Sequence, residues 1–106
     1  MNDQIAIILS ELRRQLAELY GPRLVEVVLF GSQAREDAEP DADIDVLVVL
    51  RGPVRAVTEI ERTGSIVTDL SLRHDQVIGC VFMDEQRYRT RQGPLLRNIR
   101  REGIRV

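Results

Sequence analysis

Cysteine and aromatic residues are scarce in this chain, and long apolar runs are absent. There is one cysteine, Cys80, no tryptophan, and aromatic residues occupy only 4% of the 106 positions. A single cysteine excludes an internal disulfide, and so few rings leave the core to isoleucine, leucine and valine. No apolar run reaches the roughly 18 residues that suggest a membrane-spanning helix. The N-terminus also lacks the basic segment and apolar stretch of a signal peptide, which favours a cytoplasmic protein.

An excess of positive charge is missing as well. The 15 basic and 17 acidic side chains give a net charge of −2, whereas binding to nucleic acid depends on a basic surface that neutralises phosphates. DNA is therefore not an expected partner. The basic residues do gather near the C-terminus, where residues 87–105 hold seven arginines and one acid, Glu102. This stretch fits either a solvated helix face or a surface for an anionic partner.

Chain length and hydrophobic pattern predict one domain, 1–106, of alternating helices and strands. A helix over 3–20 carries apolar residues at three- and four-residue spacing: Ile5, Ile8, Leu9, Leu12, Leu16 and Leu19. The expected strands are 24–30, 44–50 and 77–83, with a small strand at 104–106. The other expected helices are a short turn within 32–37, a long helix over 54–72 with Pro53 in its first turn, and helices at 84–90 and 95–102. This order indicates an α/β (α+β) fold in which helices pack on a small mixed sheet, with 44–50 as the central strand.

Two aspartates, Asp43 and Asp45, stand where the apolar strand 44–50 begins. Residues two apart in a strand project to the same side, about 6–7 Å from each other. Carboxylates that close repel unless a cation lies between them. Mg²⁺ takes oxygen ligands, commonly one or two carboxylates plus phosphate oxygens. The pair therefore predicts a divalent-metal site, and two ions would also fit.

Gly31 and Ser32, at the end of strand 24–30, can supply the other half of a phosphate site. Gly31 has no side chain, so a ligand can approach its backbone closely. Ser32 offers a hydroxyl and begins a short helical turn, where N–H groups bind phosphate. Arg35, one turn further on, can pair with phosphate oxygens. Either half alone fits an ordinary turn or a loop acid, but together they favour a site for a triphosphate and its metal.

These residues resemble the signature of a known family. Gly31-Ser32, ten intervening residues and Asp43-Ile44-Asp45 look like the motif of the minimal nucleotidyltransferase domain, in the DNA polymerase beta-like nucleotidyltransferase superfamily. The likeness extends over 30–35 and 40–48, and 93–103 is similar to the tail of many such small proteins. It implies the nucleotidyltransferase fold, with Gly31 and Ser32 on the β- and γ-phosphates and Asp43 and Asp45 on Mg²⁺. The implied reaction transfers a nucleoside monophosphate, with ATP as the expected donor, to a hydroxyl and releases pyrophosphate.

The resemblance also implies a partner. Small proteins of this type are often paired with a helical HEPN-domain protein as a toxin–antitoxin system, and several such antitoxins add AMP to a tyrosine of the toxin. The expected function is therefore that of a Mg²⁺-dependent protein adenylyltransferase acting as an antitoxin. The acceptor and the preferred base stay open, and so does the oligomeric state, with a homo-oligomer compatible with the sequence.

One element of the family pattern is missing. The superfamily usually has a third carboxylate on a neighbouring strand, and the end of strand 77–83 places it at about Cys80, whose thiol is a poor ligand for Mg²⁺. Asp75 and Asp84 lie roughly 16 Å and 13 Å away along an extended strand.

Three outcomes follow from that gap. The chain works slowly with two aspartates, a partner supplies the missing group, or the chain is a binding-only relative that neutralises its partner by contact. A transferase of the aminoglycoside type is less favoured, because such enzymes generally carry an extra domain for the acceptor.

Overall fold

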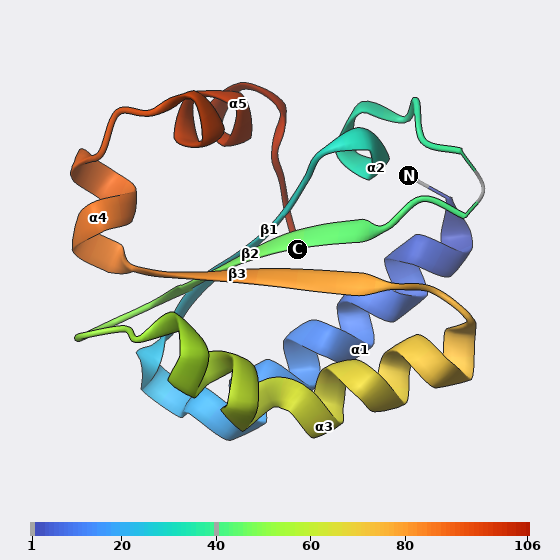
Figure 1. Cartoon of the computed structure of the whole chain (residues 1–106), viewed down its shortest axis with the longest axis horizontal. Coiled ribbons are helices and arrows are strands. Elements are labelled where there is room, and N and C mark those ends of the chain that lie inside the picture. The colour runs from blue at the N-terminus through green and yellow to red at the C-terminus, as the bar shows by residue number, and fades with distance from the viewer. Residues whose placement is uncertain (1, 40) are drawn as a thin grey trace.

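A four-stranded sheet lies between two layers of helices in the computed structural model, which describes residues 2–39 and 41–106 (Figure 1). The strands are β1 (Leu24–Phe30), β2 (Ile44–Leu50), β3 (Ile78–Asp84) and β4 (Ile104–Arg105), in the order β3-β2-β1-β4. β1 pairs antiparallel with β2 and β4, whereas β2 pairs parallel with β3. The predicted mixed sheet is confirmed, with β2 inside it.

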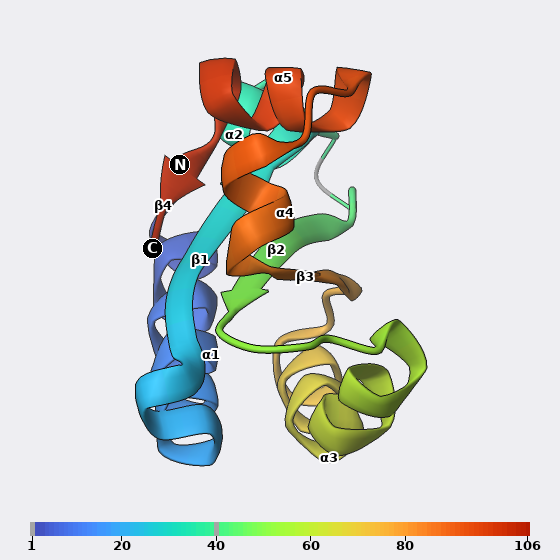
Figure 2. The ribbon, with the colours of Figure 1, turned by 90° about the vertical axis from the view of Figure 1, so that its left-hand side faces the viewer.

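The helices divide between the two sides of the sheet. α1 (Asp3–Tyr20) and α3 (Ala56–His74) lie along one side, and α2 (Ser32–Arg35), α4 (Glu85–Thr90) and α5 (Pro94–Glu102) lie on the other (Figure 2). A single 3-10 turn, η1 (Gly21–Arg23), joins α1 to β1. Within the part of the chain that is described, no helix has the length and apolar character that a membrane crossing requires.

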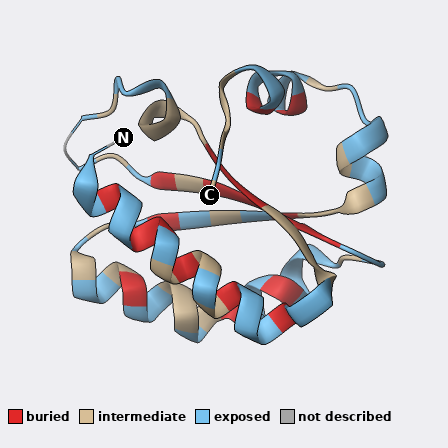
Figure 3. Ribbon diagram, turned by 180° about the vertical axis from the view of Figure 1, so that it is seen from behind, coloured by how far each residue is buried: buried red, intermediate tan, exposed pale blue. Residues whose placement is uncertain are grey.

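Two apolar cores fill the space between the sheet and these layers. Figure 3 marks the buried residues in red on the strands and on helices of both layers. Because side chains alternate along a strand, β2 serves both cores. Ile44 and Val46 join the core against α1 and α3, while Leu47 and Val49 join the core against α5. The alternation therefore turns Asp45 to the side of the sheet that carries α2, α4 and α5.

The first helix follows its sequence signals at both ends. The side chain of Asn2 accepts a hydrogen bond from the backbone N–H of Ile5 at 2.8 Å, and Gly21 ends the helix with a φ of +55°. The prediction that Leu19 belongs to the buried face is wrong, since 42% of it is exposed. Tyr20 is buried in its place, because its hydroxyl reaches Glu59 of α3.

The start of the second long helix differs from the prediction. Pro53 does not open α3, which begins at Ala56, and Arg55 still has an extended backbone. The guanidinium of Arg23 donates a hydrogen bond to the Pro53 carbonyl at 3.2 Å, so that carbonyl is used by a distant part of the chain. The helix also runs to His74, two residues beyond the predicted end, and β3 follows one residue later than expected.

Candidate active site

The pairing of β1 with β2 brings the two halves of the sequence motif together. Phe30 is the register partner of Asp45, so Gly31 leaves β1 directly beside the Asp45 side chain. Gly31 has φ +75° and ψ −157°, a conformation that only glycine adopts readily. A β-carbon at Gly31 would lie 2.6 Å from Oδ2 of Asp45. The backbone conformation and the lack of room beside the Asp45 carboxylate therefore both require glycine at this position.

The short helix α2 begins at Ser32, and its first turn is hydrogen-bonded to the carbonyl of Gly31. The Gly31 carbonyl accepts hydrogen bonds from the N–H groups of Ala34 and Arg35 at 3.1 and 3.2 Å. The first N–H groups of a helix have no partner within it. Ser32 is partly exposed, so its N–H and hydroxyl are available to an incoming anion.

A side chain of α2 ties this loop to the entrance of β2. The amide nitrogen of Gln33 donates to the carbonyl of Ala42 at 3.2 Å. This bond spans the loop between Gly31 and Asp43 and limits how far the two halves can separate. Gln33 was not singled out from the sequence as a site residue, because its role depends on a contact with the backbone nine residues away.

Asp43 and Asp45 form a carboxylate pair without a protein counter-charge. Asp43 is exposed and Asp45 half-buried, and among the described residues neither accepts a hydrogen bond or forms an ion pair. Partial burial raises the pKa of Asp45, and the negative charge of Asp43 adds to the effect. An unpaired carboxylate couple of this kind fits a hard cation, which takes oxygen ligands. Within residues 2–39 and 41–106 no group of three or more His, Cys, Asp or Glu could hold a metal, so water and phosphate oxygens would supply the other ligands.

Arg35 lies next to the Gly31-Ser32 segment, but acidic side chains hold its guanidinium. Its nitrogens contact Asp37 at 3.2 Å and Glu102 of α5 at 3.3 Å. The hydrogen bonds to Asp37 and Glu102 raise the pKa of Arg35. A role of Arg35 on phosphate, which stays a prediction, would require the guanidinium to exchange these partners.

The register of β3 corrects the position assigned to the missing third carboxylate. Gly79, and not Cys80, is the β3 partner of Asp45. Cys80 pairs with Val46 and packs against the core beside α1 and α3, where burial raises the pKa of its thiol to about 11. A β-carbon at Gly79 would lie 3.7 Å from Oδ1 of Asp45, in ordinary contact. β3 thus presents a glycine beside the aspartate pair, where the family pattern leads one to expect an acid.

Comparison with known proteins identifies the family. A family model described as "Nucleotidyltransferase domain" matches residues 9–101. A relative from Methanocaldococcus jannaschii, named "Putative protein adenylyltransferase MJ0604", is 31% identical over 104 residues, covering 97% of this chain and 96% of the relative.

Solved structures share the fold. A crystal structure of a toxin–antitoxin with AMP-PNP matches with a TM-score of 0.63 at 19% identity, over 98% of this chain and 72% of that chain. A tri-AMPylated Shewanella oneidensis HEPN toxin in complex with MNT antitoxin matches with a TM-score of 0.53 at 17% identity, over 92% and 70%. The family match includes the Gly31-Ser32 loop and both aspartates. The chain therefore belongs to the nucleotidyltransferase domain family.

Proposed function

We propose that this chain transfers AMP from ATP to a hydroxyl group of a partner protein in a Mg²⁺-dependent reaction. The observation that carries the proposal is the close approach of Asp45 to Gly31, where a β-carbon would lie 2.6 Å from Oδ2 of Asp45. Asp45 is one half of a carboxylate pair for which residues 2–39 and 41–106 supply no counter-charge. A phosphate-binding loop next to two unpaired carboxylates suits a triphosphate that arrives with its own cation.

Each residue has a definite part in this reaction. Gly31 leaves room for phosphate oxygens, and Ser32 donates from its hydroxyl and its N–H group. Asp43 and Asp45 would hold Mg²⁺, which would supply positive charge for the triphosphate and for the departing pyrophosphate. The acceptor oxygen forms a bond to the α-phosphorus, the bond from that phosphorus to the bridging oxygen breaks, and the hydroxyl proton passes to solvent. The half-buried position of Asp45 would strengthen the attraction of its carboxylate to such a cation.

The proposed acceptor is a helical HEPN-domain protein, with this chain as the antitoxin that silences it. Two observations support the choice. The relative from M. jannaschii carries the name of a protein adenylyltransferase, and a matching fold comes from a complex of an AMPylated HEPN toxin with its MNT antitoxin.

A second candidate function is a binding module that neutralises the same kind of partner without chemistry. Gly79 is the observation that favours it, because β3 supplies no third carboxylate beside Asp45. The two functions differ in one respect that can be measured. An enzyme leaves AMP on its partner, whereas a binding module leaves the partner unmodified.

Co-expression with a HEPN-domain protein tests the proposal. The mass of the HEPN protein is measured after co-expression with the wild-type chain, with Asp45→Asn, and with Asp41→Asn as an exposed acid outside the pair. We expect the mass of AMP on the HEPN protein with the wild type and Asp41→Asn, and none with Asp45→Asn. An unmodified HEPN protein that stays bound to all three chains would refute the enzyme and favour the binding module.

A further inference from the structure

A second concave site lies at the other end of the sheet from the Gly31–Asp45 contact. It is a cavity of about 310 Å³, lined by Arg23, Pro53, Arg55, Thr58, Glu59 and Arg62. Its walls come from η1, from the loop between β2 and α3, and from the first turns of α3. β1 begins and β2 ends here, so the length of a strand, roughly 20 Å, separates this cavity from the aspartate pair.

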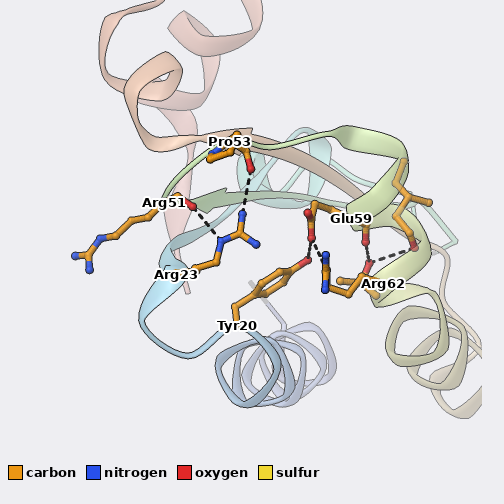
Figure 4. A network of polar contacts seen from close by, with 8 residues as sticks. Tyr20, Arg23, Arg51, Pro53, Glu59 and Arg62 are labelled. Carbon is orange, nitrogen blue, oxygen red and sulfur yellow. Dashed lines mark hydrogen bonds and ion pairs between the residues drawn. The ribbon is translucent and has the colours of Figure 1, made fainter.

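Arg23 carries a positive charge here, and no carboxylate among the described residues forms an ion pair with it. Its guanidinium donates to the carbonyl oxygens of Arg51 at 3.0 Å and of Pro53 at 3.2 Å, and it lies 5.7 Å from the centre of the Tyr20 ring (Figure 4). Both acceptors are uncharged. These contacts fix the group in place and leave its charge available.

The other two arginines of the cavity add to this charge. Arg55 is exposed and has no hydrogen bond or ion pair within the described part of the chain. In the described structure the Arg62 guanidinium bonds through its Nε alone, which lies 3.0 Å from Oε1 of Glu59. Three guanidinium groups therefore line the cavity with a single carboxylate, which leaves two positive charges in excess.

Glu59 holds Arg62 in a fixed orientation. It is only 3% exposed, and its Oε1 also accepts a hydrogen bond from the Tyr20 hydroxyl at 2.7 Å (Figure 4). Burial and the charge of Glu59 raise the pKa of Tyr20, so this phenol keeps its proton and remains a donor. The Arg62 side chain is 46% exposed, so solvent screens its ion pair with Glu59 and the pair contributes little to stability. What the contact does at the cavity is to orient the Arg62 guanidinium.

Within the described part of the chain, seven arginines have a carboxylate partner: Arg14, Arg35, Arg62, Arg73, Arg89, Arg101 and Arg105. Arg23 and Arg55 belong to the remaining arginines, and these two line the cavity. A guanidinium presents a planar set of donors that matches phosphate oxygens. The cavity volume of about 310 Å³ is at the lower end of the range for small-molecule sites.

We propose that this cavity binds the phosphoryl group of a small anion, either a free phosphate or the phosphate of a nucleotide. The site is independent of the proposed transferase activity. The net charge of −2 on the whole chain argues for a small ligand rather than a nucleic-acid strand, whose affinity depends on many phosphate contacts.

Titrations followed by NMR test this site. Inorganic phosphate, pyrophosphate and AMP are added separately to the full chain in EDTA without Mg²⁺, while backbone amide signals are recorded. We expect saturable shifts at residue 23 and over 54–62, with Gly31 unchanged. Arg55→Ala should weaken binding by about tenfold or more, since a charge-assisted contact is lost. Arg97→Ala, an exposed arginine of α5, and Asp45→Asn should bind as the wild type does.

The three ligands separate the sources of the phosphoryl group. Saturation by phosphate or pyrophosphate supports a free anion, and saturation by AMP alone supports a nucleotide. The proposal is overturned if none of the three saturates, if the shifts fall on residues 87–105, or if Arg55→Ala binds like the wild type. If Asp45→Asn still binds the anion, the proposal of a second site holds whether or not the chain is a transferase.

Discussion

At the scale of single residues, the site depends on the meeting of Gly31 and Asp45. The φ of Gly31 and the 2.6 Å that would separate its β-carbon from Asp45 both exclude a side chain. Gly52 has a similar φ of +80° but nothing within 4 Å of its β-carbon. The two glycines therefore separate the effect of backbone strain from the effect of crowding at the carboxylate.

Alanine at these glycines should have unequal effects. Gly31→Ala should lose MgATP binding and lower the unfolding temperature, because a methyl group displaces the Asp45 carboxylate. Gly52→Ala should bind MgATP normally and lose only the roughly 1–2 kcal/mol expected for a positive φ. Calorimetry and thermal unfolding measure both quantities. Equal loss of binding in the two variants would show that the crowding at Asp45 is not what matters.

Gly79 offers a test of the missing carboxylate. Gly79→Asp places an acid beside Asp45, where a β-carbon has room at 3.7 Å, and we expect it to speed the transfer of AMP to the acceptor. Gly79→Asn has nearly the same size without the charge and should leave the rate unchanged. The rates are compared by release of pyrophosphate. If both variants or neither were faster, a carboxylate at this position would not be the limiting feature.

At the scale of elements, local signals predicted most of the fold and long-range contacts decided the rest. The bounds of α1, β1 and β2 agree with the sequence prediction, because the signals for them are local: helix caps for α1 and nearly continuous apolar runs for β1 and β2. The start of α3 was missed because Arg23, some 30 residues earlier, holds the Pro53 carbonyl. The sequence placed the missing carboxylate at Cys80, one residue away from the position that faces Asp45. The pairing of β3 with β2, which sets Gly79 opposite Asp45, cannot be deduced from the β3 segment alone.

The two faces of α1 provide a stability test at this scale. Leu12 is fully buried against the sheet, whereas Leu19 is 42% exposed. Leu12→Ala should lower the free energy of unfolding by about 2–5 kcal/mol through lost packing and a cavity. Leu19→Ala should stay within about 0.5 kcal/mol of the wild type. Urea unfolding gives both values, and similar losses would mean that the helix presents a different face to the core.

At the scale of the whole molecule, the proposed active site reduces the stability of the fold. The pKa of Asp45 is raised in the folded chain by burial and by Asp43. The native state therefore holds this proton to a higher pH than the unfolded state does, and stability falls as pH rises through that window. Above the folded pKa of Asp45 the loss of stability is fully present. Below the pKa that Asp45 has in the unfolded chain, this loss is absent.

Removal of the Asp45 charge should therefore stabilise the chain at neutral pH. Asp45→Asn is expected to raise the melting temperature at pH 7, with a gain that shrinks as the pH falls through the folded pKa of Asp45. Asp41→Asn, an exposed loop position, should show no such pH-dependent gain. Thermal unfolding across acidic and neutral pH measures the difference. A gain that grew on acidification would contradict the direction of the pKa shift.

The central claim is that the Gly31-Ser32 loop and the aspartate pair form one site for MgATP. Calorimetric titration of MgATP into the wild type, Asp45→Asn and Asp41→Asn tests it most directly. We predict saturable binding to the wild type and to Asp41→Asn, and none to Asp45→Asn. Equal binding to all three chains, or no binding to any of them, would contradict the claim.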